Sequence, residues 1–295
     1  MNHNYMEVSM KSLKVQLAKR AGFCMGVDLA LQRLDKVIEE RPGETIHILG
    51  PIIHNPQVLE RYARKGVIIA ETPEDVPEGG CVVIRAHGIT RQVEQALEAR
   101  KVSIKDATCP KVKKAQLLIA RHTQDGRSLL LYGEEDHPEV RGLVSYAHGP
   151  AMVFGSYEEL ERCMAGMDGR YVLAAQTTQD RAMFDVIAEK LENRDDMDVV
   201  VLHTICDATK QRQREAMAMA REVDYMVVVG GRNSGNTRRL AQVVADQGTS
   251  VVHIETAAEL PMEDFATVSS VGVTAGASTP RDLVEDVLER LGSVE

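Results

Sequence analysis

Three cysteines occupy matching positions in three copies of one repeated unit. They lie in the segments AGF-Cys24-MGVDLALQRL, DAT-Cys109-PKVKKAQLLIA and HTI-Cys206-DATKQRQREAMAMA. Each cysteine follows a short apolar or turn-like stretch and precedes the apolar spacing of an amphipathic helix. The copies recur at roughly 90 residues, which is longer than the ~20–50 residues of a solenoid repeat. The pattern therefore predicts a triplicated small α/β domain.

The same order of strands and helices follows each cysteine. A first strand ends in a glycine (IHIL-Gly50, LLLY-Gly133 and MVVV-Gly230), and a polar residue comes shortly after it. A helix, a second apolar strand (VIIA, AMVF or VVHI) and a third strand follow, and the third strand ends at another polar residue. The polar residues after the first strands are His54, His137 and Ser234. Those after the third strands are His87, Thr177 and Ser278.

A fourth strand leads into the next cysteine in the first two copies, as VSIKDA and DVVVLH, but the third copy has no such segment. The N-terminal segment LKVQLAKRAGF leads into Cys24, so we expect strand 13–17 to complete the third copy and close a pseudo-threefold ring. Alternation of strands and helices predicts mainly parallel sheets in an α/β fold. We expect domains at 25–108, at 109–205 and at 206–295 with 12–24, preceded by a disordered extension at 1–11.

Ligands of parallel sheets bind beyond the carboxyl ends of the strands, where all three cysteines and all six polar residues are placed. Three thiolates around one axis form a soft ligand set that suits zinc or an iron–sulfur cluster. A helix N-terminus favours the thiolate form of each cysteine. A cubane cluster with three ligands leaves one iron open, so that it can act as a Lewis acid and deliver electrons. Cys81 and Cys163 have no counterparts, and we interpret them as buried small apolar residues.

The polar residues predict an anion site beside this metal. Histidines and hydroxyls without a large lysine or arginine cluster suit a compact polyanion such as a diphosphate. Residues 230–237, which include Asn236, add backbone amides at a helix start. Glu139 is the exception, because a carboxylate in an anion site is unfavourable unless it carries a proton. We interpret Glu139 as a proton donor, and the alternative is an ordinary acidic residue at a helix N-terminus.

Composition limits the partners and the compartment. The 295-residue chain has a net charge of −9, which argues against a nucleic-acid surface. No apolar run reaches the ~20 residues of a membrane span, and the N-terminus lacks a secretory pattern. Five cysteines without a secretory signal indicate a reducing compartment, so we expect a cytoplasmic protein with no membrane partner.

The chain resembles the 4-hydroxy-3-methylbut-2-enyl diphosphate reductase family, the terminal enzymes of the non-mevalonate isoprenoid route, from about Val15 to Leu291. The motifs that carry the resemblance are GFCMGVDLA, IIHN, AHG, DATCP, HPEV, QTT, ICDATKQRQ, NSGNT and VTAGAS. One departure is Gly235, where some members carry a second serine.

The resemblance implies a role for each matching residue. It places the ligands of one [4Fe–4S] cluster on Cys24, Cys109 and Cys206, and the proton relay on Glu139. It places the substrate contacts on His54, His87, His137, Thr177, Ser234, Asn236 and Ser278. The implied reaction is a two-electron reductive dehydroxylation of the allylic diphosphate to isopentenyl and dimethylallyl diphosphate, with a ferredoxin or flavodoxin as electron donor.

Two rivals use similar ligands. A hydro-lyase of the aconitase kind also has a three-cysteine cluster, but it needs no reductant and binds carboxylates, for which arginines are normally present. An iron–sulfur or zinc sensor would have no use for six matched polar residues facing the metal.

A third class, a radical enzyme that uses S-adenosylmethionine, would need a clustered C-x-x-x-C-x-x-C, which this sequence lacks.

Overall fold

The computed structural model describes residues 13–164 and 169–292. The extension predicted at 1–11 lies outside these residues. The described chain forms three four-stranded sheets, and every strand pair in them is parallel. This confirms the predicted fold class of three small α/β units.

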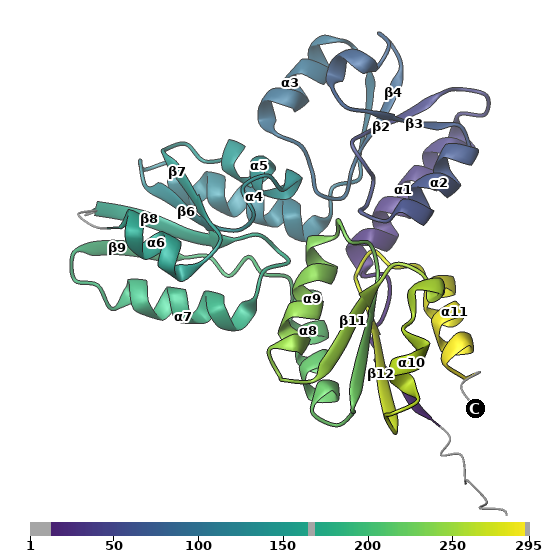
Figure 1. Cartoon of the computed structure of the whole chain (residues 1–295). Coiled ribbons are helices and arrows are strands. Elements are labelled where there is room, and N and C mark those ends of the chain that lie inside the picture. The colour runs from purple at the N-terminus through teal and green to yellow at the C-terminus, as the bar shows by residue number, and fades with distance from the viewer. Residues whose placement is uncertain (1–12, 165–168, 293–295) are drawn as a thin grey trace, which may run out of the picture. The chain divides into compact units, whose positions relative to one another are not determined.

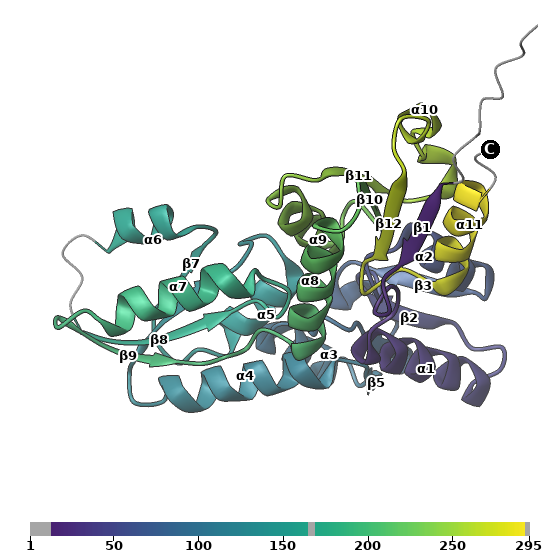
Figure 2. The ribbon, with the colours of Figure 1, turned by 90° about the horizontal axis from the view of Figure 1, so that it is seen from below.

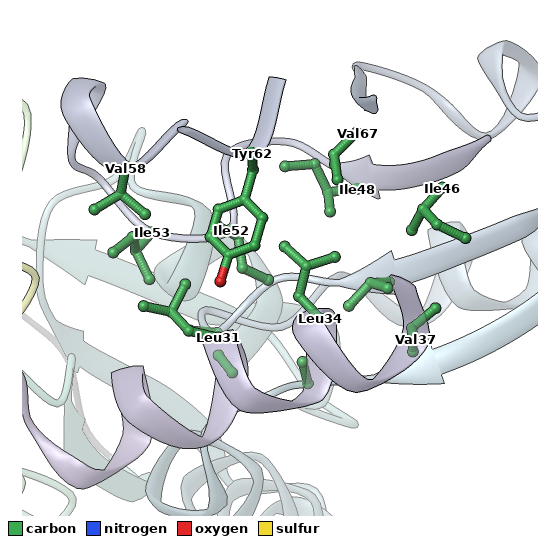
Figure 3. Packing of buried hydrophobic residues seen from close by; sticks show 14 of the residues in the cluster. Leu31, Leu34, Val37, Ile46, Ile48, Ile52, Ile53, Val58, Tyr62 and Val67 are labelled. Atoms are coloured by element: carbon green, nitrogen blue, oxygen red, sulfur yellow. The ribbon is translucent and has the colours of Figure 1, made fainter. Parts of the chain in front are cut away.

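The first sheet has the order β3-β2-β4-β5. Its strands are β2 (Ile46–Leu49), β3 (Val67–Ala70), β4 (Cys81–Ile84) and β5 (Ser103–Asp106). Its helices are α1 (Met25–Glu40), α2 (Pro56–Arg64), η1 (Pro73–Asp75) and α3 (Arg91–Ala99). Figure 3 shows the face that α1 and α2 cover, where Leu31 and Leu34 of α1 and Tyr62 of α2 pack on Ile46 and Ile48 of β2. Leu97 of α3 belongs to the core on the other face.

The second sheet repeats this topology in the order β7-β6-β8-β9. Its strands are β6 (Ser128–Tyr132), β7 (Ala151–Phe154), β8 (Gly169–Ala175) and β9 (Met197–Val201). Its helices are α4 (Pro110–Thr123), α5 (Pro138–Ser145), α6 (Tyr157–Cys163) and α7 (Arg181–Glu192). Successive side chains of β6 point to opposite faces, so Leu131 packs under α4 and α5 and Tyr132 packs under α6 and α7. Burial on both faces explains why these strands are continuously apolar.

The third sheet has the order β1-β12-β10-β11, in which β1 (Lys14–Leu17) takes the place of the fourth strand. The other strands are β10 (Tyr225–Val229), β11 (Ser250–Ile254) and β12 (Ser270–Ala275). The helices are α8 (Asp207–Ala220), α9 (Gly235–Ala245), η2 (Ala257–Glu259), α10 (Met262–Phe265) and α11 (Arg281–Gly292). Lys14 pairs with Ser270 and Leu17 with Val273. The prediction that the N-terminal strand completes the third copy is therefore confirmed. Figure 1 shows the labelled elements of this copy in the whole chain, and Figure 2 shows β1 beside β12.

The chain divides into two compact units. Residues 23–211 form one unit with the first two sheets, and the described residues of 1–22 and 212–295 form the other with the third sheet. Each of the three predicted domain ranges contains one sheet, and the boundaries themselves and the pseudo-threefold ring stay predictions. Within the described parts of the chain, no helix combines the length and the apolar character that crossing a membrane requires.

The two unmatched cysteines differ in their surroundings. Cys81 is 1% exposed and belongs to the core under α1, as predicted. Cys163 is exposed at the end of α6, so its interpretation as a buried residue was wrong. Leu160 is the one fully buried residue of α6 and Tyr157 is half-buried against the same core, whereas the other residues of this short helix are exposed.

Candidate functional site

Each of the three repeat-matched cysteines begins a helix. Cys24 and Cys109 are the N-cap residues of α1 and α4, and Cys206 directly precedes α8. The carbonyl of each accepts a hydrogen bond from the amide four residues further on, at 3.0, 2.9 and 3.0 Å respectively. All three cysteines belong to the unit of residues 23–211, and all three are partly buried. This unit therefore holds the complete set of predicted ligands.

A close approach between α1 and the start of α4 brings thiols together. A Cβ atom on Gly26 would lie 2.4 Å from Sγ of Cys109 and 3.9 Å from Sγ of Cys24. A real Cβ atom does not come within 3.0 Å of a sulfur without displacing it, so the position requires glycine. Sequence reasoning missed this role of Gly26, although its place one residue beyond Met25 in the GFCMG motif was a usable signal.

The electrostatic state of Cys109 corrects one prediction. Burial raises the pKa of the Cys109 thiol, the amides of Lys111 and Val112 lower it, and the thiols of Cys24 and Cys206 raise it again. The helix amides lower this pKa as expected, but burial and repulsion outweigh them, so the expectation that the thiolate is the favoured form was wrong for Cys109. A bound cation removes the repulsion, since a metal-coordinated thiol is deprotonated outright.

Backbone hydrogen bonds attach two of these cysteines to the polar strand ends. The amide of Cys109 donates to the carbonyl of Ala86 at 2.9 Å, and Ala86 directly precedes His87. The amide of Cys206 donates to the carbonyl of Thr177 at 3.0 Å. The positions of the thiols and of the polar side chains are therefore coupled through short stretches of backbone.

The three predicted histidines form one cluster, the histidine cup, made of His54, His87 and His137. They follow β2, β4 and β6. Their ring centroids are 4.6 Å apart for His54 and His87, 5.6 Å for His54 and His137, and 5.3 Å for His87 and His137. One ring nitrogen from each lies within 4.8 Å of the others. Such a group can hold a cation through unprotonated nitrogens or an anion through N–H groups.

The protonation of two of these rings follows from their contacts. His137 is the N-cap of α5, and its Nδ1 accepts a hydrogen bond from the amide of Glu139 at 3.1 Å. In the neutral ring the proton therefore sits on Nε2. Burial, the other two histidines and Arg85 lower the pKa of His87 well below its usual value. Its Nδ1 is buried without a partner among the described residues, which marks a place where a ligand can bind.

Glu139 is a buried carboxyl group rather than a solvated residue at a helix start. It is 1% exposed. The amide of Thr177 donates to its Oε1 at 2.6 Å, and the hydroxyl of Thr177 donates to its Oε2 at 3.0 Å. Burial raises the pKa of Glu139 to about 7, against the opposing effect of the two Thr177 contacts. A carboxyl group with this pKa is suited to general acid catalysis near neutral pH.

Three further predicted residues lie in the other compact unit, the one with the third sheet. Ser234 is the N-cap of α9, and its hydroxyl accepts a hydrogen bond from the amide of Thr237 at 3.4 Å. The hydroxyl of Ser278 donates to that of Ser234 at 3.4 Å. Asn236 is buried in the first turn of α9, and its Nδ2 has no partner within the described chain. These side chains form a second polar group at the ends of β10 and β12.

Comparisons with known proteins agree on one family. The profile of the family described as "LytB protein" matches residues 15–292. The 4-hydroxy-3-methylbut-2-enyl diphosphate reductase of Desulfovibrio desulfuricans is 55% identical over 287 residues, which cover 96% of this chain and 100% of that protein. The enzyme of the same name from Geobacter sulfurreducens is 46% identical over 279 residues, 95% of this chain and 97% of that one.

Solved structures give the same result. The E-1-hydroxy-2-methyl-but-2-enyl-4-diphosphate reductase from Plasmodium falciparum matches with a TM-score of 0.88 and 25% identity, over 94% of this chain and 87% of that one. A structure described as (E)-4-hydroxy-3-methyl-but-2-enyl diphosphate reductase, the terminal enzyme of the non-mevalonate pathway, matches with a TM-score of 0.67 and 38% identity. That match covers 95% of this chain and 99% of the other.

The raised pKa of Glu139 predicts a specific dependence of stability on pH. An unfolded glutamate loses its proton near pH 4.5, and the folded one keeps it until about pH 7. The folded state therefore binds more protons between these values, and the parent protein loses stability as the pH rises through this window. Relative to Glu139→Gln, the loss should reach at most about 3 kcal/mol, measured by urea unfolding.

Glu135→Gln is the matched control, because Glu135 is exposed in the segment that directly precedes α5. It should reproduce the pH profile of the parent. Parallel profiles for the parent and Glu139→Gln between pH 4.5 and 7 would show that the carboxyl group of Glu139 is ionised throughout this range.

Proposed function

Since this chain belongs to the LytB family, we propose that it is a 4-hydroxy-3-methylbut-2-enyl diphosphate reductase. It removes the hydroxyl group of this allylic diphosphate with two electrons and yields isopentenyl and dimethylallyl diphosphate. The observation that carries the proposal is the placement of three helix-starting cysteines, the histidine cup and a buried carboxyl group in one compact unit. Sequence identity of 55% to a reductase of this name, over its whole length, supports it.

Cys24, Cys109 and Cys206 fit a cluster with three protein ligands. Their donor set is soft, and the glycine at position 26 leaves the space in which the thiols approach one another. We propose that they hold one [4Fe–4S] cluster. When bound, such a cluster supplies single electrons and one iron that can act as a Lewis acid.

The histidine cup binds the anionic substrate in this proposal. In its neutral form His137 carries its proton on Nε2 and can donate a hydrogen bond from that atom. His87 is neutral before binding, and a nearby diphosphate favours its protonated form. The ring thus gains a charge-assisted hydrogen bond when the substrate arrives. The assignment of Ser234, Asn236 and Ser278 to the same ligand stays a prediction.

Glu139 and Thr177 supply the proton. The amide of Thr177 holds Oε1 of Glu139 as an acceptor, so the acidic proton belongs on Oε2, beside the Thr177 hydroxyl. In the ionised form the hydroxyl donates to Oε2. When Oε2 is protonated this hydrogen bond reverses, so Oε2 donates to Oγ1 and the hydroxyl can donate its own proton toward the substrate. A pKa of about 7 allows Glu139 to give up this proton and to regain it at neutral pH.

The reaction balances with two protons and two electrons. The carbon–oxygen bond to the hydroxyl group breaks, one carbon–hydrogen bond forms, and water leaves. A hydro-lyase would move water without consuming electrons, so a requirement for reductant separates the two functions. A ferredoxin or flavodoxin as electron donor and a cytoplasmic location both stay predictions.

The ligand assignment is tested by replacing the cysteines with serine one at a time. Cys24→Ser, Cys109→Ser and Cys206→Ser should each lose most of the iron of the anaerobically purified protein. The controls Cys81→Ser and Cys163→Ser should keep it. The measurement is the iron content together with the visible and electron-spin spectra. Equal loss in Cys81→Ser would contradict the assignment, and stoichiometric zinc without iron would exclude the redox mechanism.

The role of His87 is tested by calorimetric titration of substrate in buffers that differ in ionisation enthalpy. The parent should take up protons on binding near pH 7, because the bound anion raises the pKa of this buried ring. His87→Asn should take up fewer protons. Its affinity should fall about tenfold or more, since one charge-assisted hydrogen bond contributes roughly 1.5–3 kcal/mol. Equal proton uptake by the two proteins would place the anion away from His87.

Proton delivery is tested with Glu139→Gln, which keeps the size and hydrogen-bonding capacity of the side chain. It should bind substrate with near-parental affinity but turn over about 10²–10⁴-fold more slowly, the usual range for losing a general acid. Turnover is measured with excess chemical reductant, and binding by calorimetry. A rate within a few-fold of the parent would remove Glu139 from the reaction.

A further inference from the structure

The helix that begins at Cys109 has an unusual charge pattern. The chain carries a net charge of −9, yet α4 (Pro110–Thr123) contains no acidic residue. Its cationic residues are Lys111, Lys113, Lys114 and Arg121. Three of them lie in the first turns, where the helix dipole disfavours positive charge. Positive charges at these positions destabilise the helix. We therefore expect these lysines to serve a function other than helix stability.

The positive charge of α4 is only partly neutralised. Nζ of Lys113 lies 3.4 Å from a carboxylate oxygen of Asp106, and Nζ of Lys111 lies 3.8 Å from one of Asp207. Lys114 and Arg121 are exposed and form no ion pair with any described residue. These two side chains keep their charge available to a partner.

Apolar surface lies between these two charges. Leu117 is 59% exposed, and Leu118 beside it is half-buried. Positions 114, 117, 118 and 121 share one side of the helix, because residues three and four apart are neighbours there. We call Lys114, Leu117, Leu118 and Arg121 the α4 stripe. An apolar centre with a charged rim is the usual composition of a protein-binding surface.

The α4 stripe adjoins a predicted cluster ligand. A small cavity of about 90 Å³ lies between the start of α4 and residues 203–207, and Lys114, Leu118 and Cys206 line it. Within the unit of residues 23–211, α4 lies on one face of the second sheet, which contains β6, β7, β8 and β9. The α7 helix lies on the other face (Figure 2). The same surface therefore offers a docking face and a short approach to a thiol of the metal site.

We infer that the α4 stripe docks the protein that delivers electrons, an acidic one-electron carrier of the ferredoxin type. The inference rests on the proposed function, because only a reductase needs such a partner. An acidic carrier is repelled by the net negative charge of the chain as a whole. A local basic stripe attracts it and orients it toward the metal site, which raises the association rate.

Each docking event transfers one electron. Two reduced carriers are oxidised in turn, and their two electrons, together with two protons taken up from solvent, convert one substrate molecule into product and water. The carrier has to leave between transfers, so a small interface with a polar rim is suitable and a large apolar one is not.

The test compares two electron donors on the cluster-loaded protein. The variant Lys114→Glu/Arg121→Glu reverses both exposed charges. With a reduced plant-type [2Fe–2S] ferredoxin at limiting concentration and low salt, its turnover should fall about tenfold or more. With dithionite-reduced methyl viologen, which needs no docking surface, its turnover should equal that of the parent. Added salt should slow the ferredoxin-driven parent and affect the variant much less.

A control with the same change of charge is Arg61→Glu/Arg64→Glu on α2, whose residues are also exposed. It should keep the parental rate with ferredoxin. Leu117→Ser, which changes no charge, should also slow only the ferredoxin-driven reaction.

Three outcomes would overturn the inference. An unchanged ferredoxin rate in the Lys114→Glu/Arg121→Glu variant would place the docking site elsewhere. An equal loss with both donors would mean that the two cations serve the metal site rather than the partner. A parent protein that fails to reduce substrate even with methyl viologen would refute the proposed function itself, and the inference with it.

Discussion

The close approach of α1 to the start of α4 is the contact on which the site depends. Only a glycine at position 26 lets the thiols of Cys24 and Cys109 lie beside the same helical turn. Hydrogen bonds from the amides of Cys109 and Cys206 then join the thiols to the segments that carry His87 and Thr177. The rigid parallel sheets hold these segments at their carboxyl ends, so that metal ligands and polar groups are positioned together.

Burial keeps this site close to neutral. It lowers the pKa of His87, raises that of Glu139 to about 7 and raises that of the Cys109 thiol. Each buried group thus favours its uncharged form in a medium that solvates charge poorly. A cation bound by the thiols or an anion bound by the histidines changes these states, and binding is then coupled to proton movement. The same burial that destabilises charges therefore prepares the groups for acid–base chemistry.

Much of the fold follows from local pattern. The expected strands are present, and β1 completes the third sheet, because continuous apolar runs ending in glycine match strands buried on both faces. Two expectations failed for a common reason. Cys163 is exposed and the pKa of Cys109 is raised, and both depend on how much protein surrounds a side chain. Neighbouring residues in the sequence carry little information about that.

The sequence by itself determined the triplication, the parallel α/β class, the candidate metal ligands and the one acidic residue among the matched polar positions. Periodicity and matched positions can be recognised from the order of residues alone. Tertiary structure decided the rest. It set the contact at Gly26, the burial of Glu139 with its hydrogen bonds from Thr177, the spacing of the three imidazoles and the exposure of Leu117 beside two exposed cations. These properties depend on distances between residues that are far apart in the chain. Such distances are fixed only in the folded protein, after packing has excluded water.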